Sequence, residues 1–223
     1  MFKSKNRVTV LITLFVMCMV VLALIISRAT YAYLAPKETP TMTNSSSITA
    51  SGDSLLFANG TPFSMNASVA NFDYSAGSLI STTTSQARLI GGEDNIESTG
   101  EATASYDIKL NVTGNTFVYS NTNTYPEILL QLFVDNVEVT DIDLDSLTYK
   151  TVTDRDNNTQ KGFDLTAITT GNYTLLDDYQ ISTTSSTTGT THNWTFKLIF
   201  VNYEFDQSAN EDASMDLTIT LDY

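Results

Sequence analysis

Few residues in this sequence could carry chemistry. The chain has one histidine, His192, and one cysteine, Cys18. A zinc site needs three or four Cys, His or carboxylate ligands, and a serine triad would have to run through the single histidine. The sequence contains neither a His-Glu-x-x-His helix nor a Gly-x-Ser-x-Gly turn, and it lacks a glycine-rich phosphate loop. We therefore expect a protein that is not an enzyme and has no cofactor.

A run of three aspartates is the strongest candidate for a bound ion. Asp141, Asp143 and Asp145 alternate with Ile142 and Leu144, so on a strand their carboxylates would share one face. Such a group of oxygen ligands suits calcium, bound weakly. The alternative, which we favour, is a solvated edge strand on which like charges discourage pairing with another strand.

A second acidic segment, Asp154–Gly162, begins with the Asp-x-Asp-x-Asn spacing of an EF-hand loop. The match then fails, because Thr159 stands at the required glycine and Leu165 at the required glutamate. The segment separates two strand-like runs and is rich in Asp and Asn, which is typical of a hairpin tip. We expect a turn here rather than a metal site.

The N-terminus predicts export. Lys3, Lys5 and Arg7 precede Val8–Ile26, an uncharged run of 19 residues interrupted only by two threonines. As a helix this run would rise about 28 Å, close to the hydrocarbon thickness of about 30 Å. Basic residues before the run favour an orientation with the N-terminus inside the cell. The domain that follows is therefore expected outside the cell or on its surface.

Two positions suit a signal peptidase, because small residues stand three and one residues before each cut. They are Ser27 with Ala29, and Thr30 with Ala32; the second would start the mature chain at Tyr33. If neither is cut, residues 8–26 tether the protein to the membrane.

Three regions follow from this pattern. Residues 1–32 are a signal peptide or membrane anchor, and residues 33–47, which contain Pro36 and Pro40, are an extended arm or linker. Residues 48–223 are long enough for one domain with a substantial core. All 25 acidic residues but only 7 of the 11 basic ones follow Arg28, which gives this part a formal charge of −18. Nucleic acid would repel such a domain, so we expect no nucleic-acid partner.

Alternation with a period of two dominates the domain and predicts strands at Tyr106–Val112, Leu130–Val134 and Leu217–Tyr223. Trp194–Val201 also alternates, but it becomes apolar on both faces and predicts a central strand covered on both sides. Weaker strand candidates are Ser54–Phe57, Ala67–Phe72, Leu79–Thr83, Leu147–Val152, Gly162–Ile168 and Leu175–Ser182, with loops at Gly91–Asn95 and Thr183–Thr191. Many short strands separated by turn signals predict an all-β fold, a two-sheet sandwich that is jelly-roll-like, preceded by an N-terminal transmembrane or signal helix.

Both ends of the chain resemble one family. Arg28-Ala-Thr-Tyr-Ala-Tyr-Leu34 resembles the processing region of exported proteins cut by a SipW-type signal peptidase, and Ile48–Phe57 is similar to the strand that follows it there. Near the C-terminus, His192–Asn202, then Asp206–Asn210 and a closing alternating strand, are similar to the end of the same proteins. These are the TasA/camelysin-type cell-surface and biofilm-matrix proteins of Gram-positive bacteria.

The resemblance implies a jelly-roll-like sandwich that polymerises into fibres, in which an N-terminal strand of one subunit completes the sheet of the next. Here the arm at residues 33–47 would be the donor. Pro36 and Pro40 each remove a backbone donor, so Asn44–Ala50 would pair more readily. Camelysin members have been labelled metalloproteases, but this sequence has no metal-binding histidine motif that would carry such an activity.

Two functions therefore remain. The first is a non-enzymatic structural protein of the cell surface or biofilm matrix that self-associates into a homo-oligomer or fibre, with a signal peptidase as its processing partner. The alternative is a membrane-anchored monomeric adhesin, whose loop tyrosines would contact a ligand. Candidates for that contact are Tyr119, Tyr125, Tyr173 and Tyr203.

Overall fold

The computed structural model describes residues 48–50, 52–68 and 78–223. The chain divides into two compact units, Met1–Thr39 and Pro40–Tyr223, and every described residue belongs to the second. The apolar run Val8–Ile26, the processing residues Thr30, Ala32 and Tyr33, and the arm at 33–47 lie outside the described residues. Within the described ranges, no helix combines the length and the apolar character that a membrane crossing needs.

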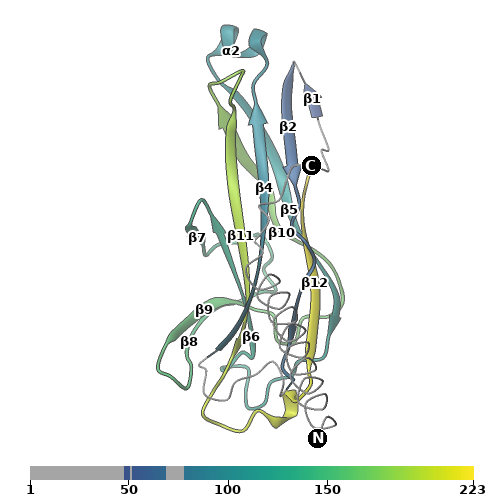
Figure 1. Ribbon diagram of the computed structural model, residues 1–223, viewed down its shortest axis with the longest axis vertical. Coiled ribbons are helices and arrows are strands. Elements are labelled where there is room, and N and C mark those ends of the chain that lie inside the picture. Colours follow the sequence, from purple (N-terminus) through teal and green to yellow (C-terminus); the bar gives the residue numbers. More distant parts are fainter. Residues whose placement is uncertain (1–47, 51, 69–77) are drawn as a thin grey trace, which may run out of the picture. The chain divides into compact units, whose positions relative to one another are not determined.

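The described chain forms two antiparallel sheets (Figure 1). The first sheet has the order β1-β2-β4-β11-β6-β9-β8, and β7 pairs with β6. Its strands are β1 (Ile48–Ala50), β2 (Asp53–Ala58), β4 (Ser78–Ile90), β11 (Thr190–Val201), β6 (Ile128–Val134), β7 (Val137–Val139), β9 (Thr159–Asp164) and β8 (Tyr149–Thr153).

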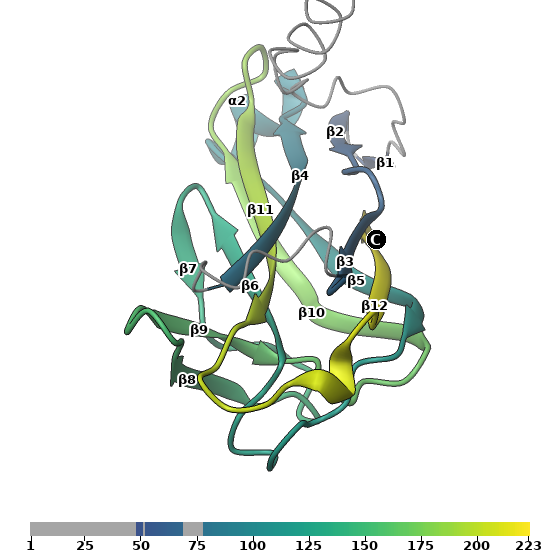
Figure 2. The ribbon, with the colours of Figure 1, turned by 60° about the horizontal axis from the view of Figure 1, so that its bottom comes forward.

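The second sheet has the order β10-β5-β12-β3. Its strands are β10 (Gly171–Thr183), β5 (Ala102–Asn115), β12 (Ser214–Asp222) and β3 (Phe63–Asn66). Two short helical elements, α2 (Glu93–Thr99) and η1 (Ser208–Asn210), lie in connections. The sheets pack face to face, with β4 and β11 over β5 and β10 (Figure 2), which confirms the predicted all-β sandwich.

Alternation along the strands builds the core between the sheets. Every second residue of β5 from Tyr106 to Val112 is buried, and so is every second residue of β12 from Met215 to Leu221. They meet the inward residues of the first sheet, of which Trp194 is the largest. The second half of β11 is buried on both faces, because Ile199 and Val201 join a second apolar cluster on the outer side of the first sheet. The predicted central strand is therefore confirmed.

Turns form where short polar residues tolerate a left-handed backbone. Asp135 and Asn136 have φ of 49° and 68° and join β6 to β7 as a two-residue hairpin, as expected for a turn in which both central residues have positive φ. The predicted hairpin tip after Asp154 is also present, because β8 and β9 pair on either side of it.

The carboxylate of Asp154 organises that tip. It accepts hydrogen bonds from the backbone N–H of Asp156 (3.0 Å) and Asn158 (2.9 Å), from the Gln160 amide (2.9 Å) and from the Ser78 hydroxyl (3.1 Å). Burial acts to raise the pKa of Asp154, but the four hydrogen bonds outweigh it and lower the pKa below its usual value. Asp154 therefore stabilises the hairpin tip.

Three strand or loop predictions differ from the structure. The predicted loop Gly91–Asn95 contains the start of helix α2. The strand predicted at Gly162–Ile168 ends at Asp164, and the chain then turns, with the Ile168 N–H donating to the Leu165 carbonyl. A strand was expected at Ala67–Phe72, but β3 lies just before it, and residues 69–72 lie outside the described part of the chain.

The acidic run Asp141–Asp145 is not on a strand, which corrects both interpretations of it. Its exposure does alternate, because Ile142 and Leu144 pack against the core while the aspartates face solvent. However, it forms a connection between β7 and β8. Asp143 ties it to β10: the Asp143 N–H donates to the Leu175 carbonyl (2.9 Å), and the Asp143 carboxylate accepts from the Asp177 N–H (2.8 Å). The alternation of acidic and apolar residues in this segment therefore reflects packing against the core and not pairing within a sheet.

Candidate strand-acceptor site

The second sheet leaves part of one strand unpaired. β10 pairs with β5 from Ala102 to Val112, whereas β12 pairs with it only from Asp107 to Asn115. β5 continues past the end of β12 toward α2 (Figure 1). On the β12 side, Ala102–Tyr106 therefore has no partner strand among the residues that the structure describes. An open strand edge presents N–H and C=O groups that can pair with another chain.

A groove of about 470 Å³ adjoins this edge. Its floor is apolar: Leu55 of β2, Leu89 of β4 and Tyr106 of β5 are each no more than 2% exposed. Its other lining residues are Asp53, Thr103, Ala104, Ser105, Asp107, Asp177, Asp178 and Tyr223. The groove thus runs between the free edge of β5 and the strands of the opposite sheet, where a further strand of the second sheet would lie.

The rim of the groove is acidic and locally fixed. Asp53 accepts hydrogen bonds from the backbone N–H of Gly92 (2.7 Å) and from the Asn95 amide (2.8 Å). The Ser105 hydroxyl donates to Asp178 (3.0 Å), and the Asp178 N–H donates to Asp107 (3.1 Å). These contacts hold the carboxylates in place beside the open edge.

A bulge in β10 brings the rim carboxylates together. The pairing of β10 with β5 shifts between Leu176 and Tyr179, and Asp178 adopts a φ of 53° there. The negative charge of Asp107, together with smaller effects of burial and neighbouring carboxylates, raises the pKa of Asp177. The rim therefore favours an occupant that is uncharged or positive.

The C-terminal end of β12 closes the other side of the groove. Its edge is capped by the Asn59 side chain, whose Oδ1 accepts from the Leu221 N–H (2.7 Å) and whose amide donates to the Leu221 carbonyl (3.5 Å). Tyr223 is 53% exposed and stacks on Phe57 at 6.4 Å between ring centroids. The Asn59 side chain thus pairs with backbone groups of Leu221 that a neighbouring strand would otherwise bind, so β12 presents less free edge than β5.

His192 belongs to a buried network beneath the groove. The Trp194 indole N–H donates to the Tyr106 hydroxyl (2.8 Å), which lies 2.9 Å from Nδ1 of His192. When His192 carries its proton on Nε2, Nδ1 accepts the proton of the Tyr106 hydroxyl, so that this hydroxyl both accepts from Trp194 and donates to His192. Burial lowers the pKa of His192, although the charge of Asp135 opposes this. The network joins the two sheets and suits a structural role.

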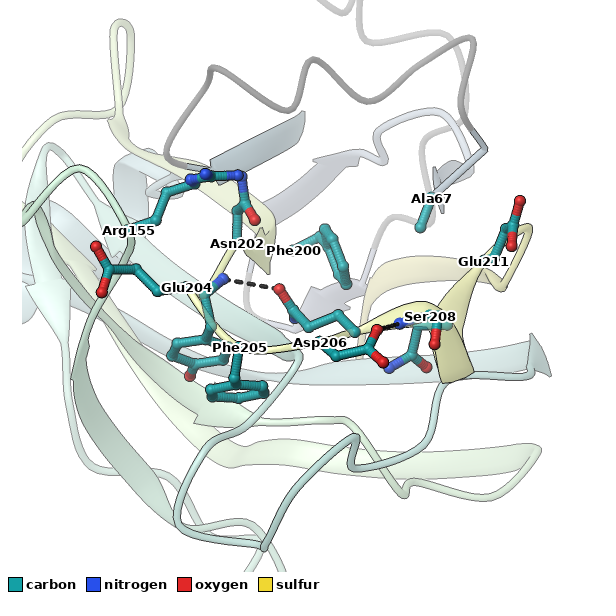
Figure 3. Close-up of a pocket in the computed structure, with 12 residues that line it drawn as sticks. Ala67, Arg155, Phe200, Asn202, Glu204, Phe205, Asp206, Ser208 and Glu211 are labelled. Atoms are coloured by element: carbon teal, nitrogen blue, oxygen red, sulfur yellow. Dashed lines mark hydrogen bonds between the residues drawn. The ribbon is translucent and has the colours of Figure 1, made fainter.

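A second groove of about 280 Å³ lies at the other end of the sandwich (Figure 3). Gln207 lines it, but its side chain is fully engaged: it accepts from the Tyr203 N–H (2.7 Å) and donates to the Val201 carbonyl and to the Glu127 carboxylate. Asp206, also on the wall, accepts from the Ser208 N–H (2.9 Å). These polar groups therefore fold the loop after β11 and are not left free for a ligand.

The four tyrosines proposed for an adhesin do not form one surface. Tyr203 is buried and donates to the Pro126 carbonyl (2.9 Å). Tyr119 donates to Asp164 (2.9 Å), and burial, with help from this hydrogen bond, raises its pKa to about 12. The Tyr173 hydroxyl donates to the Thr169 carbonyl (2.8 Å). Tyr125 is exposed, and its ring packs edge to face on that of Tyr203, with 5.5 Å between the ring centroids.

The proposed calcium ligands do not converge. Asp141, Asp143 and Asp145 lie in the connection between β7 and β8, and Asp143 is committed to β10. Among the described residues, no three His, Cys, Asp or Glu side chains are grouped closely enough to hold a metal ion.

Sequence reasoning missed the open edge of β5 and the residues around it. No motif marks Ala102–Tyr106, because its openness depends on where β12 ends. The Asp177–Asp178 pair, inserted between Leu176 and Tyr179, is the one signal that could have indicated the bulge.

We compared the chain with protein-family models, with curated proteins and with solved structures, and none of the three comparisons found a match.

Proposed function

We propose that this protein is a non-enzymatic structural subunit of a cell surface or biofilm matrix, of the TasA/camelysin type, and that it assembles by strand addition. The N-terminal arm of one copy would pair with the free edge of β5, Ala102–Tyr106, in the next. The observation that carries this proposal is the unpaired five-residue edge beside a groove with an apolar floor. Export through the N-terminal segment would deliver the subunit to the outside of the cell.

The arm has the length that such pairing needs. Five paired residues span about 17 Å, whereas the 15 residues from 33 to 47 can extend to about 50 Å. The arm's last seven residues, 41–47, follow Pro40 and keep all their backbone donors. Residues Ile48–Ala50 already pair with β2 in the same chain, so we place the donor before Ile48.

The chemistry of residues 41–47 also suits the groove. The segment Thr-Met-Thr-Asn-Ser-Ser-Ser has no charged residue, so it would meet no repulsion from the acidic rim. The rim carboxylates are those of Asp53, Asp107, Asp177 and Asp178. Threonine favours strands, and Met42 offers an apolar side chain to the floor. Main-chain hydrogen bonds would supply affinity in this mode of recognition.

Two proline substitutions test the proposal. Thr43→Pro removes a backbone donor within 41–47, and Ala35→Pro, placed outside it, is the matched control. The full-length protein is expressed in a host that exports it, and the exported product is examined by electron microscopy and sedimentation velocity. We expect the parent and Ala35→Pro to form fibres and Thr43→Pro to remain short or monomeric.

Fibres that form unchanged with Thr43→Pro would refute strand addition by this segment. A parent protein that stays monomeric at high concentration and remains membrane-bound would instead support the anchored adhesin. N-terminal sequencing of the product gives the processing state directly, because the proposal expects a start near Tyr33.

A further inference from the structure

The end of the second sheet next to α2 is only two strands wide. There Tyr179–Thr183 of β10 pairs antiparallel, residue by residue, with Ala102–Tyr106 of β5. The outer side of β5 at these residues is the acceptor edge described above. Because β10 is the last strand of its sheet, its own outer side at Tyr179–Thr183 also has no partner strand among the described residues. This part of the sheet therefore has two open edges, one on each side.

The open edge of β10 has defined ends. The bulge just before Tyr179 interrupts the strand, and beyond it the Asp143 N–H donates to the Leu175 carbonyl (2.9 Å), so that part of the edge is already bonded. After Thr183 the chain turns toward the first sheet, where the Ser185 carbonyl accepts from the Gly91 N–H (3.1 Å). Five residues thus remain open, which is a usual length for a strand.

The open edge of β10 lacks the features that normally keep sheet edges apart. Proteins protect such edges with charged side chains, proline or bulges. Residues 179–191 contain no charged residue and no proline, although the chain has 25 acidic residues. Within 179–183 the pairing with β5 is regular, and tyrosine, isoleucine and threonine favour strands. The edge is therefore suited to main-chain pairing with another strand.

The first sheet leaves room beside this edge. Its strand β11 packs over β10. Thr190–His192 of β11 pair with β4 only, because β6 pairs with β11 no further along than Trp194. The β6–β7 hairpin ends well below the turn that joins β10 to β11 (Figure 1). Both layers of the sandwich are therefore open on this side.

We propose that two copies of this protein pair through this edge, with Tyr179–Thr183 of one antiparallel to Tyr179–Thr183 of the other about a two-fold axis at Ile181. The segment suits itself as a partner because it is uncharged along its whole length. The antiparallel arrangement places Asp178 of each copy opposite Thr184 of the other and keeps the two acidic bulges at opposite ends. A parallel arrangement would bring the bulges side by side, and like charges directly opposite each other are destabilising.

This pairing is small and independent of strand addition. Five paired residues span about 17 Å, so we expect a weak dimer with a dissociation constant on the order of 0.1–1 mM. The contact uses the edge of the sheet opposite to that of β5, so it neither requires the N-terminal arm nor blocks it. In a fibre, which rests on the proposed function, the same contact would be repeated along the length and would gain strength by avidity.

Charges placed on the open edge test the pairing. Gln180 and Ser182 are exposed, and the proposed axis sets each opposite the other in the second copy. One variant combines Gln180→Lys with Ser182→Lys, and the other combines Gln180→Glu with Ser182→Glu. Both are made in the exported protein carrying Thr43→Pro, the parent here, so that strand addition does not contribute; detergent is added if the protein stays in the membrane. Sedimentation velocity up to about 1 mM measures self-association.

We expect each variant alone to associate at least about tenfold more weakly than the parent, because two pairs of like charges then stand directly opposite each other. An equal mixture of the two variants should associate at least as tightly as the parent, since lysine then faces glutamate in both pairs. Asn172→Glu with Thr174→Glu is the matched control. It adds the same charge to β10 on the other side of the bulge and should leave association unchanged.

The proposal is overturned if the parent is monomeric up to about 1 mM, if either variant alone associates as the parent does, or if the mixture fails to recover. The same holds if the control weakens association as much as the glutamate variant does. Fluorescence of the single tryptophan, Trp194, verifies that every variant is folded. A failure of strand addition alone would leave all of these outcomes unchanged, because the parent already lacks it.

Discussion

Removing the hydroxyl of Tyr106 isolates the network that ties the two sheets together. The Trp194 indole N–H donates to this hydroxyl at 2.8 Å, and both side chains are 1% exposed. In Tyr106→Phe the indole N–H loses its partner and water cannot replace it. Leaving a buried donor unsatisfied costs about 1–3 kcal/mol, so the free energy of unfolding should fall by about that amount.

The assay is urea unfolding followed by the fluorescence of Trp194. We expect a lower midpoint with an unchanged slope, which marks a change of stability alone. For a domain of this size, a loss of about 1–3 kcal/mol lowers the melting temperature by about 2–12 °C.

Tyr179→Phe is the matched control. The Tyr179 ring packs edge to face on Trp194 at 5.1 Å, but its hydroxyl has no hydrogen bond to any residue in the described ranges. Its loss should change stability by no more than about 0.5 kcal/mol. If Tyr106→Phe costs no more than Tyr179→Phe, the reasoning from the buried network is wrong.

Two further predictions concern buried carboxylates. Asp154→Ala should lower the free energy of unfolding by about 1–3 kcal/mol, because two N–H groups of the hairpin tip lose their acceptor; the exposed neighbour Asp156→Ala is the control in urea unfolding and should be nearly neutral. The lowered pKa of Asp154 means that its contribution is present above the unfolded pKa and is lost as pH falls through the folded pKa. Burial raises the pKa of Glu127, so the folded protein should lose stability as pH rises from the unfolded pKa of this carboxyl through its folded pKa. The quantity to measure is the unfolding free energy of the parent minus that of Glu127→Gln. Across that pH window we expect this difference to fall by up to about 1.4 kcal/mol per pH unit. A difference that rises with pH would contradict the raised pKa of Glu127.

Local patterns in the sequence were enough to find most strands. In β5 and β12, alternation placed Tyr106, Ile108 and Leu110 in the core as predicted, because a strand turns successive side chains to opposite faces. The apolar second half of β11 similarly identified a strand buried on both sides. The same reasoning failed at Asp141–Asp145, where a connection that packs against the core also buries every second side chain.

The sequence by itself therefore determined the class of fold, the acidic surface and the scarcity of catalytic residue types. Only the tertiary structure decided that β12 ends opposite Asp107 and leaves Ala102–Tyr106 unpaired, and that Tyr106, His192 and Trp194 share one network. These features join residues 86 to 115 positions apart in the sequence. Alternation fixes which face of a strand is buried, but it does not specify which strand lies beside it or where the pairing stops, because both depend on the register of the whole sheet.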